Sequence, residues 1–423
     1  MQFSPLDLIA VVLFLVAFFG WLNLRALHLP VPVGLLAIST AVSLAIVAAE
    51  RLFPSLGLAA MLGSLLGQIN FSQAVLNFLL SFLMFAAGMS IDVGALRGTG
   101  WTAGVLATVG TVISTLLVGA AFYFVTGLFG LQLSFAWCLV FGALISPTDP
   151  AAMLASVKYV PLPRDVKALL QAESVFNDGI GIVLFTALLA AAAGSGAIDY
   201  AGVAGDVLVK GGGAVILGGA AALLAIRAMH KIDDYGVETA LTIALATGIY
   251  ALSQHFGLSG PIATATAGLL VGTDRASKAM SEVAQRYVRG FWNLVDEILN
   301  AVLFLLIGLE VVALEFDWRF VLPAICAIVL VLLARLTSVS VPAVLLARSR
   351  ETIGYWIIPV LTWSGARGAL SIALALMLPA TPERALILSC TYAIVLFAIF
   401  VQSMSMPAFL RRLGIAEAPS ERA

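Results

Sequence analysis

Two carboxylates and two neutral polar side chains stand in one apolar stretch, QAESVFNDGIGIVLF, as Glu173, Ser174, Asn177 and Asp178. A carboxylate near the centre of a bilayer costs at least about 2.5 kcal/mol, so it needs a partner or a water-filled path. At about 100° per residue, Ser174 and Asp178 share one stripe of a helix, and Glu173 and Asn177 share another. The two carboxylates lie about 140° apart around that helix, so we expect them to face different partners.

Asp178 has the chemistry of an exchange site for a monovalent cation. Hard cations prefer oxygen ligands, and the Asp178 carboxylate, the Ser174 hydroxyl and the oxygens of Thr148 could supply them. A carboxylate that holds either a proton or a cation, but never both, is sufficient for exchange, because only the neutralised site can cross an apolar barrier. The alternative is structural: Asp178 caps a helix or pairs within the helix bundle.

Arg335 is a charge deep in the apolar run VLVLLARLTSVSVP. A guanidinium stays protonated in proteins, and an unpaired buried charge is strongly destabilising, so a buried carboxylate should meet it. We predict that Glu173 pairs with Arg335 and that Asn177 satisfies a neighbouring polar group. The competing hypothesis makes Glu173 a second transport carboxylate.

Asp149 and Arg367 stand in two segments that should interrupt helices, SPTDP at 146–150 and SGARG at 364–368. Prolines remove backbone donors and clash with the preceding turn, and glycines loosen a helix. Opposed half-helix ends each carry about half a charge, which Asp149 would offset at N-terminal ends and Arg367 at C-terminal ends. Two alternatives remain: Asp149 attracts cations in a cytoplasmic funnel, or the segments are unrelated kinks.

Three further polar residues, Asp296, Glu297 and Asn300, precede the apolar run AVLFLLIGLE. Negative groups near a cytoplasmic entrance would concentrate cations there. The equally weighted alternative is that these side chains cap a helix start or bond to a neighbouring loop.

The amino-acid composition indicates that these residues are positioned by membrane-spanning helices. The chain has 423 residues, of which 61% are hydrophobic and 11% charged. Its mean hydropathy is +1.08. An ordinary soluble domain has about 25% charged residues, so we predict an all-α polytopic membrane protein. At about 20 residues per helix, the length allows about 13 transmembrane spans. They are predicted at 6–26, 31–50, 72–91, 100–127, 131–157, 165–193, 203–229, 236–256, 259–273, 288–313, 319–346, 352–378 and 384–410.

The short, glycine-rich apolar segment 54–70 is predicted as an interfacial or re-entrant piece, with a fourteenth span as the alternative. Basic residues favour thirteen spans: about sixteen fall on one side of the membrane and about four, Lys210 among them, on the other. The positive-inside rule then places the N-terminus outside and the C-terminus in the cytoplasm, in a cell (plasma or inner) membrane.

The predicted spans form two halves. Spans 1–6 occupy residues 1–193, a connector with span 7 occupies 194–235, and spans 8–13 occupy 236–410, followed by a short cytoplasmic tail at 411–423. Six spans and an odd connector place the second half in inverted orientation, with an interrupted helix in the fifth span of each half. Inverted repeats are a common plan of transporters, with the site at the midplane where helices break.

Other classes of function lack support in the sequence. Three distant cysteines do not make a disulfide scaffold. A net charge of −1 leaves no footprint for nucleic acid. The glycine-rich runs lack the strand and GK[ST] of a nucleotide loop, and no metal-ligand cluster or nucleophile constellation accompanies them. We therefore predict a transporter rather than an enzyme, with no cofactor, no bound nucleotide and no nucleic-acid partner.

Several stretches occur together in the order and spacing of one transporter family. They are ALISPTDPAA (143–152), ESVFNDG (173–179), EILNAVLFLLIGLEV (297–311), the Arg335 segment and TWSGARGALSIALAL (362–376). On these stretches the chain resembles the monovalent cation:proton antiporter family, specifically its bacterial NhaP-like sodium/proton exchangers. The resemblance implies a 13-span inverted-repeat fold, a homodimer, and exchange by an elevator-like movement of a core domain.

The resemblance also implies roles for individual residues. Asp178 corresponds to the essential ion- and proton-binding carboxylate, and Thr148 and Ser174 to cation ligands. Asn177 occupies the place where electrogenic relatives carry a second aspartate, which resembles the electroneutral branch. Glu173 and Arg335 match the family's buried ion pair. One departure concerns the third span, where many relatives carry a cation-binding glutamate and this chain has the carboxylate-free stretch FAAGM at 85–89.

The predicted function is secondary antiport of cytoplasmic sodium, lithium or potassium against external protons, one for one, for pH and salt homeostasis. The cation would bind at Asp178, Ser174 and Thr148. Two alternatives stay open: an ion-coupled symporter of an organic solute, which needs a larger cavity and recognition groups, and a cation channel, which needs no counter-ion.

Overall fold

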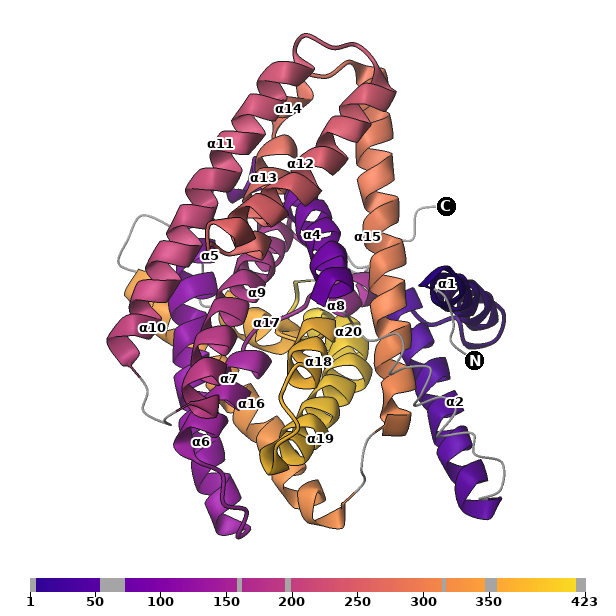
Figure 1. Ribbon diagram of the computed structural model, residues 1–423, viewed down its shortest axis with the longest axis vertical. Helices are drawn as coiled ribbons and strands as arrows, with labels where there is room; N and C mark the ends of the chain where they lie inside the picture. Colours follow the sequence, from indigo (N-terminus) through magenta and orange to yellow (C-terminus); the bar gives the residue numbers. More distant parts are fainter. Residues whose placement is uncertain are drawn as a thin grey trace.

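The computed structural model describes residues 5–53, 73–157, 162–194, 199–313, 317–346 and 356–415. Within these ranges the chain is helical and contains no strand (Figure 1). The predicted re-entrant piece at 54–70 and most of the predicted tail, from residue 416 on, lie outside the described residues.

In chain order the first helices are α1 (Pro5–Leu22), η1 (Asn23–Leu27), α2 (Val31–Leu52), α4 (Gln73–Ser90), η3 (Ala95–Gly98), α5 (Gly100–Val105), η4 (Leu106–Gly110), α6 (Thr111–Leu128), α7 (Phe135–Ile145), α8 (Ala151–Ser156) and α9 (Arg164–Ala193). The remaining helices are α10 (Tyr200–Asp206), η5 (Val207–Gly211), α11 (Gly212–Met229), α12 (Tyr235–His255), α13 (Gly260–Val271), α14 (Asp274–Ser277), α15 (Glu282–Glu310), η6 (Val311–Ala313), η7 (Trp318–Phe320), α16 (Val321–Leu346), α17 (Ile357–Ser364), α18 (Ala369–Leu376), α19 (Pro382–Phe397), η8 (Ala398–Ser403) and α20 (Met404–Arg412).

Nine of the described helices, taken through their π-helical segments, are long and apolar enough to cross a membrane, and the bent pair of α17 and α18 makes a tenth candidate. Three shorter apolar helices lie within α4, α7 and α13. Each predicted span overlaps one of these helices or the bent pair. The all-α multi-pass class is therefore confirmed. Thirteen crossings and the inverted repeat stay predictions, because length and composition do not decide whether the shorter helices cross.

Both predicted interruptions are present. The first lies between α7, which ends at Ile145, and α8, which begins at Ala151. The second lies between α17, which ends at Ser364, and α18, which begins at Ala369, with a bend of 44°. The prolines of the first segment cannot donate to a preceding turn, and the glycines of the second resist helix formation, so each helix stops where the sequence indicates.

Helices α4 and α13 cross closely. A Cβ atom added to Gly88 would clash with the Ala265 carbonyl oxygen, and one added to Gly268 would clash with the Phe85 carbonyl oxygen. Two helix backbones approach this closely only where the side chain is a hydrogen atom. Small residues at such crossings are typical of membrane helix packing.

Helices α1 and α2 lie at one edge of the molecule, beyond α15 (Figure 1). Large apolar side chains of α1, including Leu6, Ile9, Phe14 and Trp21, are exposed there. An apolar surface of this kind is stable against lipid, which is as apolar as the side chains themselves.

The substitution Gly268→Ala should destabilise the protein by about 1–3 kcal/mol, because the new methyl group forces the backbones of α4 and α13 apart. We expect a lower melting temperature of the purified protein in detergent. Gly248→Ala is the matched control, since a Cβ there meets open space. Equal melting temperatures for the two variants would contradict the close crossing.

Candidate functional site

The two interrupted helices meet at their interruptions. The Asp149 backbone N–H donates to the Ala366 carbonyl at 2.7 Å. The Arg367 guanidinium donates to the carbonyls of Ser146 and Pro147. Segments more than 200 residues apart in sequence therefore satisfy each other's freed backbone groups, as irregular backbone inside a membrane protein requires.

The charges at this crossing match the half-helix ends that they face. Arg367 is 1% exposed and donates to carbonyls at the C-terminal end of α7, where partial negative charge gathers. The Asp149 carboxylate accepts from the Ala151 backbone N–H at 2.8 Å, at the start of α8. It also lies against Gly368, at the start of α18, so closely that a Cβ there would clash with it. The arrangement is the one expected from the macrodipole argument.

Glu173 and Arg335 form a buried, bidentate ion pair. Arg335 Nη1 lies 2.7 Å from Glu173 Oε1, and Nη2 lies 2.7 Å from Oε2. The side chains are 6% and 2% exposed for Arg335 and Glu173. Arg335 Nε also donates to the Leu361 carbonyl at 3.2 Å, near the end of α17. The pair thus joins α9, α16 and α17 beside the second interruption.

Asn177 extends this network to the first interruption. Its Nδ2 donates to Glu173 Oε1 at 3.1 Å and to Thr148 Oγ1 at 2.7 Å, while its Oδ1 accepts from the Thr148 backbone N–H at 3.2 Å. The Ser174 hydroxyl donates to the Thr148 carbonyl at 2.5 Å. Two side chains of α9, Asn177 and Ser174, therefore hold the segment around Thr148 in place.

A cavity of about 380 Å³ opens beside this network. Most of its lining is apolar, from α4, α9, α13, α15 and α18, and its acidic groups are Asp149, Asp178 and Asp296. Asp149 lies near enough to Asp178 and Asp296 for the carboxylates to repel one another. A cavity that gathers negative charge in apolar surroundings favours a cation or protons.

Asp178 lies on the cavity and is partly exposed to it. Its carboxylate makes no hydrogen bond to another residue that the structure describes, so its oxygens remain available to a ligand. Ser174 lines the same cavity one turn away, on the stripe that the sequence indicates. Thr148 is 3% exposed and is not part of the lining; its side chain contacts Asn177 instead. The structure thus places two of the three expected cation ligands on the cavity and the third behind Ser174.

Only two of the three predicted entrance residues line the cavity. Asp296 and Asn300 line the cavity from α15, where Asn300 Nδ2 donates to Asp296 Oδ1 at 3.1 Å. Glu297 is exposed and is not part of the lining. Residues 296 and 300 share a helix face and residue 297 faces about 100° away, so the helical period separates them.

Several polar residues of the cavity lining were not predicted from the sequence as site residues, namely Lys210, Tyr250 and Gln254. Lys210 had counted only as a basic residue on the outer side. The signal that could have found it is a charge inside the apolar run of residues 203–229. Two residues of the third span also line the cavity: Ala87, within the carboxylate-free stretch 85–89, and Met84, directly before it.

Two interrupted helices that cross beside a cavity lined with carboxylates define a secondary transporter for small ions. Within that class, the chain belongs to the sodium/hydrogen exchanger family: the model of its transmembrane domain matches residues 13–412.

Curated relatives of the chain carry antiporter names. It is 38% identical, over 96% of its length and 97% of the relative's, to the Na(+)/H(+) antiporter NhaP of Pseudomonas aeruginosa. It is 32% identical, over 82% of its length and 84% of the relative's, to the Na(+)/H(+) antiporter NhaH of Halobacillus aidingensis. Among solved structures, the sodium proton antiporter MjNhaP1 of Methanocaldococcus jannaschii has the same fold, with a TM-score of 0.66 at 20% identity over 91% of this chain and 98% of that one.

Replacing one partner of the buried ion pair should destabilise the protein more than replacing both partners. Arg335→Met leaves the Glu173 carboxylate buried without its partner, and we expect a loss of about 3–5 kcal/mol. The double variant Arg335→Met/Glu173→Leu should recover much of that stability. Melting temperatures in detergent measure both. Arg319→Ala is the control, because it removes an exposed ion pair with Asp317 and should leave the melting temperature nearly unchanged. A double variant less stable than the single one would contradict this prediction.

Proposed function

We propose that this chain exchanges cytoplasmic sodium for external protons across a cell membrane and so helps to control internal pH and salt. The observation that carries the proposal is the Asp178 carboxylate, which lies on a cavity, beside two interrupted helices, without a hydrogen bond to another described residue. Relatives that match nearly the full length of the chain are named Na(+)/H(+) antiporters, which supports the same assignment.

Asp178 would bind the cation and the proton in turn. The Ser174 hydroxyl gives its hydrogen to the Thr148 carbonyl, so its lone pairs remain for a cation on the Asp178 stripe. Thr148 would contribute an oxygen after a small shift of the interrupted segment away from Asn177. A sodium ion or a proton neutralises the carboxylate. The neutral site then becomes accessible from the other side of the membrane.

The stoichiometry that we propose is one proton for one cation. Asn177 is neutral, and Glu173 is held as a carboxylate by a bidentate contact with Arg335. Asp178 is then the single group of α9 that exchanges its counter-ion. With this ratio, one unit of pH difference supports about a tenfold cation gradient, and the membrane potential contributes nothing.

Asp149 and Asp296 would draw cations into the cavity before they reach Asp178; Asn300 would hold the Asp296 carboxylate, and Glu297 would lie outside the cavity. Arg367 and Glu173 with Arg335 would keep the interrupted segments in register. Sodium, lithium and potassium are all candidate substrates, because the third span supplies no carboxylate to define the coordination shell. The organic-solute symporter and the cation channel are the outcomes that the flux measurements below would reveal.

The proposal includes an architecture for exchange. Residues 1–193 and 236–410 would form inverted repeats joined by 194–235, with the N-terminus outside and the tail at 411–423 in the cytoplasm. Two copies would form a homodimer in the membrane, and a core that contains both interrupted helices would move against the rest.

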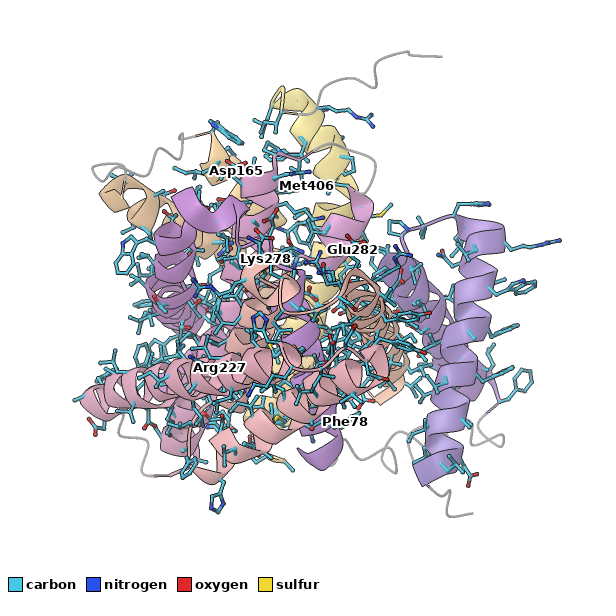
Figure 2. All side chains as sticks on the ribbon, turned by 90° about the horizontal axis from the view of Figure 1, so that it is seen from above. Phe78, Asp165, Arg227, Lys278, Glu282 and Met406 are labelled. Carbon is cyan, nitrogen blue, oxygen red and sulfur yellow. The ribbon has the colours of Figure 1, made fainter. Side chains whose placement is uncertain are left out.

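The substitution Asp178→Asn should abolish sodium-evoked proton movement, because an amide neither ionises nor exchanges a proton for a cation. Proteoliposomes with an entrapped pH dye measure the movement after addition of sodium, lithium or potassium. Asp165→Asn is the matched control: this exposed aspartate stands near the start of the same helix (Figure 2) and is not part of the cavity lining, so its variant should keep native rates. Native rates in Asp178→Asn would disprove the site.

The exchange rate of the native protein should be the same at a clamped potential of zero and of about 100 mV, because one positive charge moves each way. A rate that rises with interior-negative potential would show that more than one proton enters per cation. Cation flux that follows voltage without proton movement would show a channel.

A further inference from the structure

Lys210 is a charge inside an apolar helix that neither the ion pair nor the exchange site uses. It lies in η5, ten residues into the apolar helical segment Tyr200–Met229. Its Nζ lies 2.7 Å from Asp206 Oδ2, one turn earlier, and the two side chains are 40% and 39% exposed. An intramembrane charge is costly and by default marks a functional group.

Lys210 lines the same cavity as Asp178, whereas its partner Asp206 is not part of the lining. The next residue, Gly211, lies against Ile180, two residues beyond Asp178 in α9. The Lys210 carbonyl accepts from the Ser259 backbone N–H at 3.1 Å, which ties η5 to the start of α13. The backbone of η5 is thus held at nearly the depth of Asp178.

The cavity lining carries side chains of both charges. Its lining runs from Gln171 to Thr186 on that helix, which spans about 22 Å at 1.5 Å per residue. The titratable and charged side chains on it are Asp149 before α8, Asp178 in α9, Lys210 in η5, Tyr250 in α12 and Asp296 in α15. Among the described lining residues, α4, α13 and α18 contribute none. Lys210 is therefore the one basic group of the described lining, which also carries three carboxylates.

We propose that Lys210 is an affinity-setting residue: its fixed positive charge weakens the binding of both the cation and the proton at Asp178 by the same factor. The proposal rests on the proposed exchange at Asp178. Both ligands carry one positive charge to the same carboxylate, so a distant charge repels them equally. For two unit charges that face the same partly hydrated cavity without touching, an effect of about threefold is expected.

Asp206 has a complementary purpose. It holds the Lys210 ammonium and cancels part of its field, so the pair permits a charge in an apolar helix without occupying the cavity with a fourth carboxylate. Removal of Asp206 should therefore strengthen the repulsion that Lys210 exerts.

Equal weakening of both ligands has a distinctive signature under competition. At acid pH, protons occupy Asp178, and the half-saturating sodium concentration depends on the ratio of the two affinities, which Lys210 leaves unchanged. At alkaline pH that concentration depends on sodium affinity alone. A general disturbance of the fold would shift it at every pH instead.

The experiment measures the half-saturating sodium concentration for proton movement in proteoliposomes from pH 6 to pH 9. For Lys210→Met we expect a fall of about threefold at pH 9, no change at pH 6, and a bend displaced by about half a pH unit to the alkaline side. Lys210→Arg should behave as native, because it keeps the charge. Arg227→Met is the matched control: this arginine is exposed on α11 (Figure 2) and is not part of the cavity lining.

Asp206→Asn provides an independent variant, because it should raise the half-saturating concentration at pH 9 and leave it unchanged at pH 6. The inference is overturned if Lys210→Met matches the native curve, if its shift is the same at every pH, or if Lys210→Arg fails to restore native values. A native protein whose half-saturation does not rise toward acid pH, or an active Asp178→Asn variant, would instead overturn the proposed exchange.

Discussion

Backbone groups freed inside an apolar bundle must find partners within the protein, and the two interrupted helices depend on this constraint. Each interruption supplies what the other lacks: the Ala366 carbonyl accepts from the Asp149 N–H, and Arg367 donates to two carbonyls of the first segment. Without this crossing, polar backbone would lie unsatisfied among apolar side chains, at several kcal/mol for each group. The irregular segments are therefore stable only as a pair.

The charged side chains of the site differ in the partners that they contact. Glu173 and Arg335 neutralise each other and brace the second interruption, while Asn177 and Ser174 bind the first through Thr148. Asp178 lines the cavity one turn from Ser174, and its carboxylate has no ion-pair partner among the described residues. One helix thus presents an ion-paired carboxylate on one stripe and a cavity-lining carboxylate on another, which is possible because different stripes of a helix meet different neighbours.

The cavity itself is formed by helices that are distant in sequence. Glycines allow α4 and α13 to approach closely behind it, α15 contributes Asp296 and Asn300, and η5 contributes Lys210. Carboxylates and an ammonium act together there, because apolar walls screen charge less than water does. In the exchange that we propose, the affinity of Asp178 for a cation would therefore depend on several helices rather than on one motif.

The sequence by itself determined the class of fold, the positions of both interruptions, and the stripe of α9 on which Asp178 lies. It also indicated that Arg335 needs a buried carboxylate. These conclusions follow from local rules: the cost of charge in apolar runs, the helical period, and the chemistry of proline and glycine. Only the tertiary structure decided that the interruptions cross, that Thr148 lies behind Ser174, that Glu297 lies apart from Asp296, and that Lys210 reaches the cavity. Which faces of distant helices meet depends on packing across the whole bundle, and no local pattern in the chain encodes it.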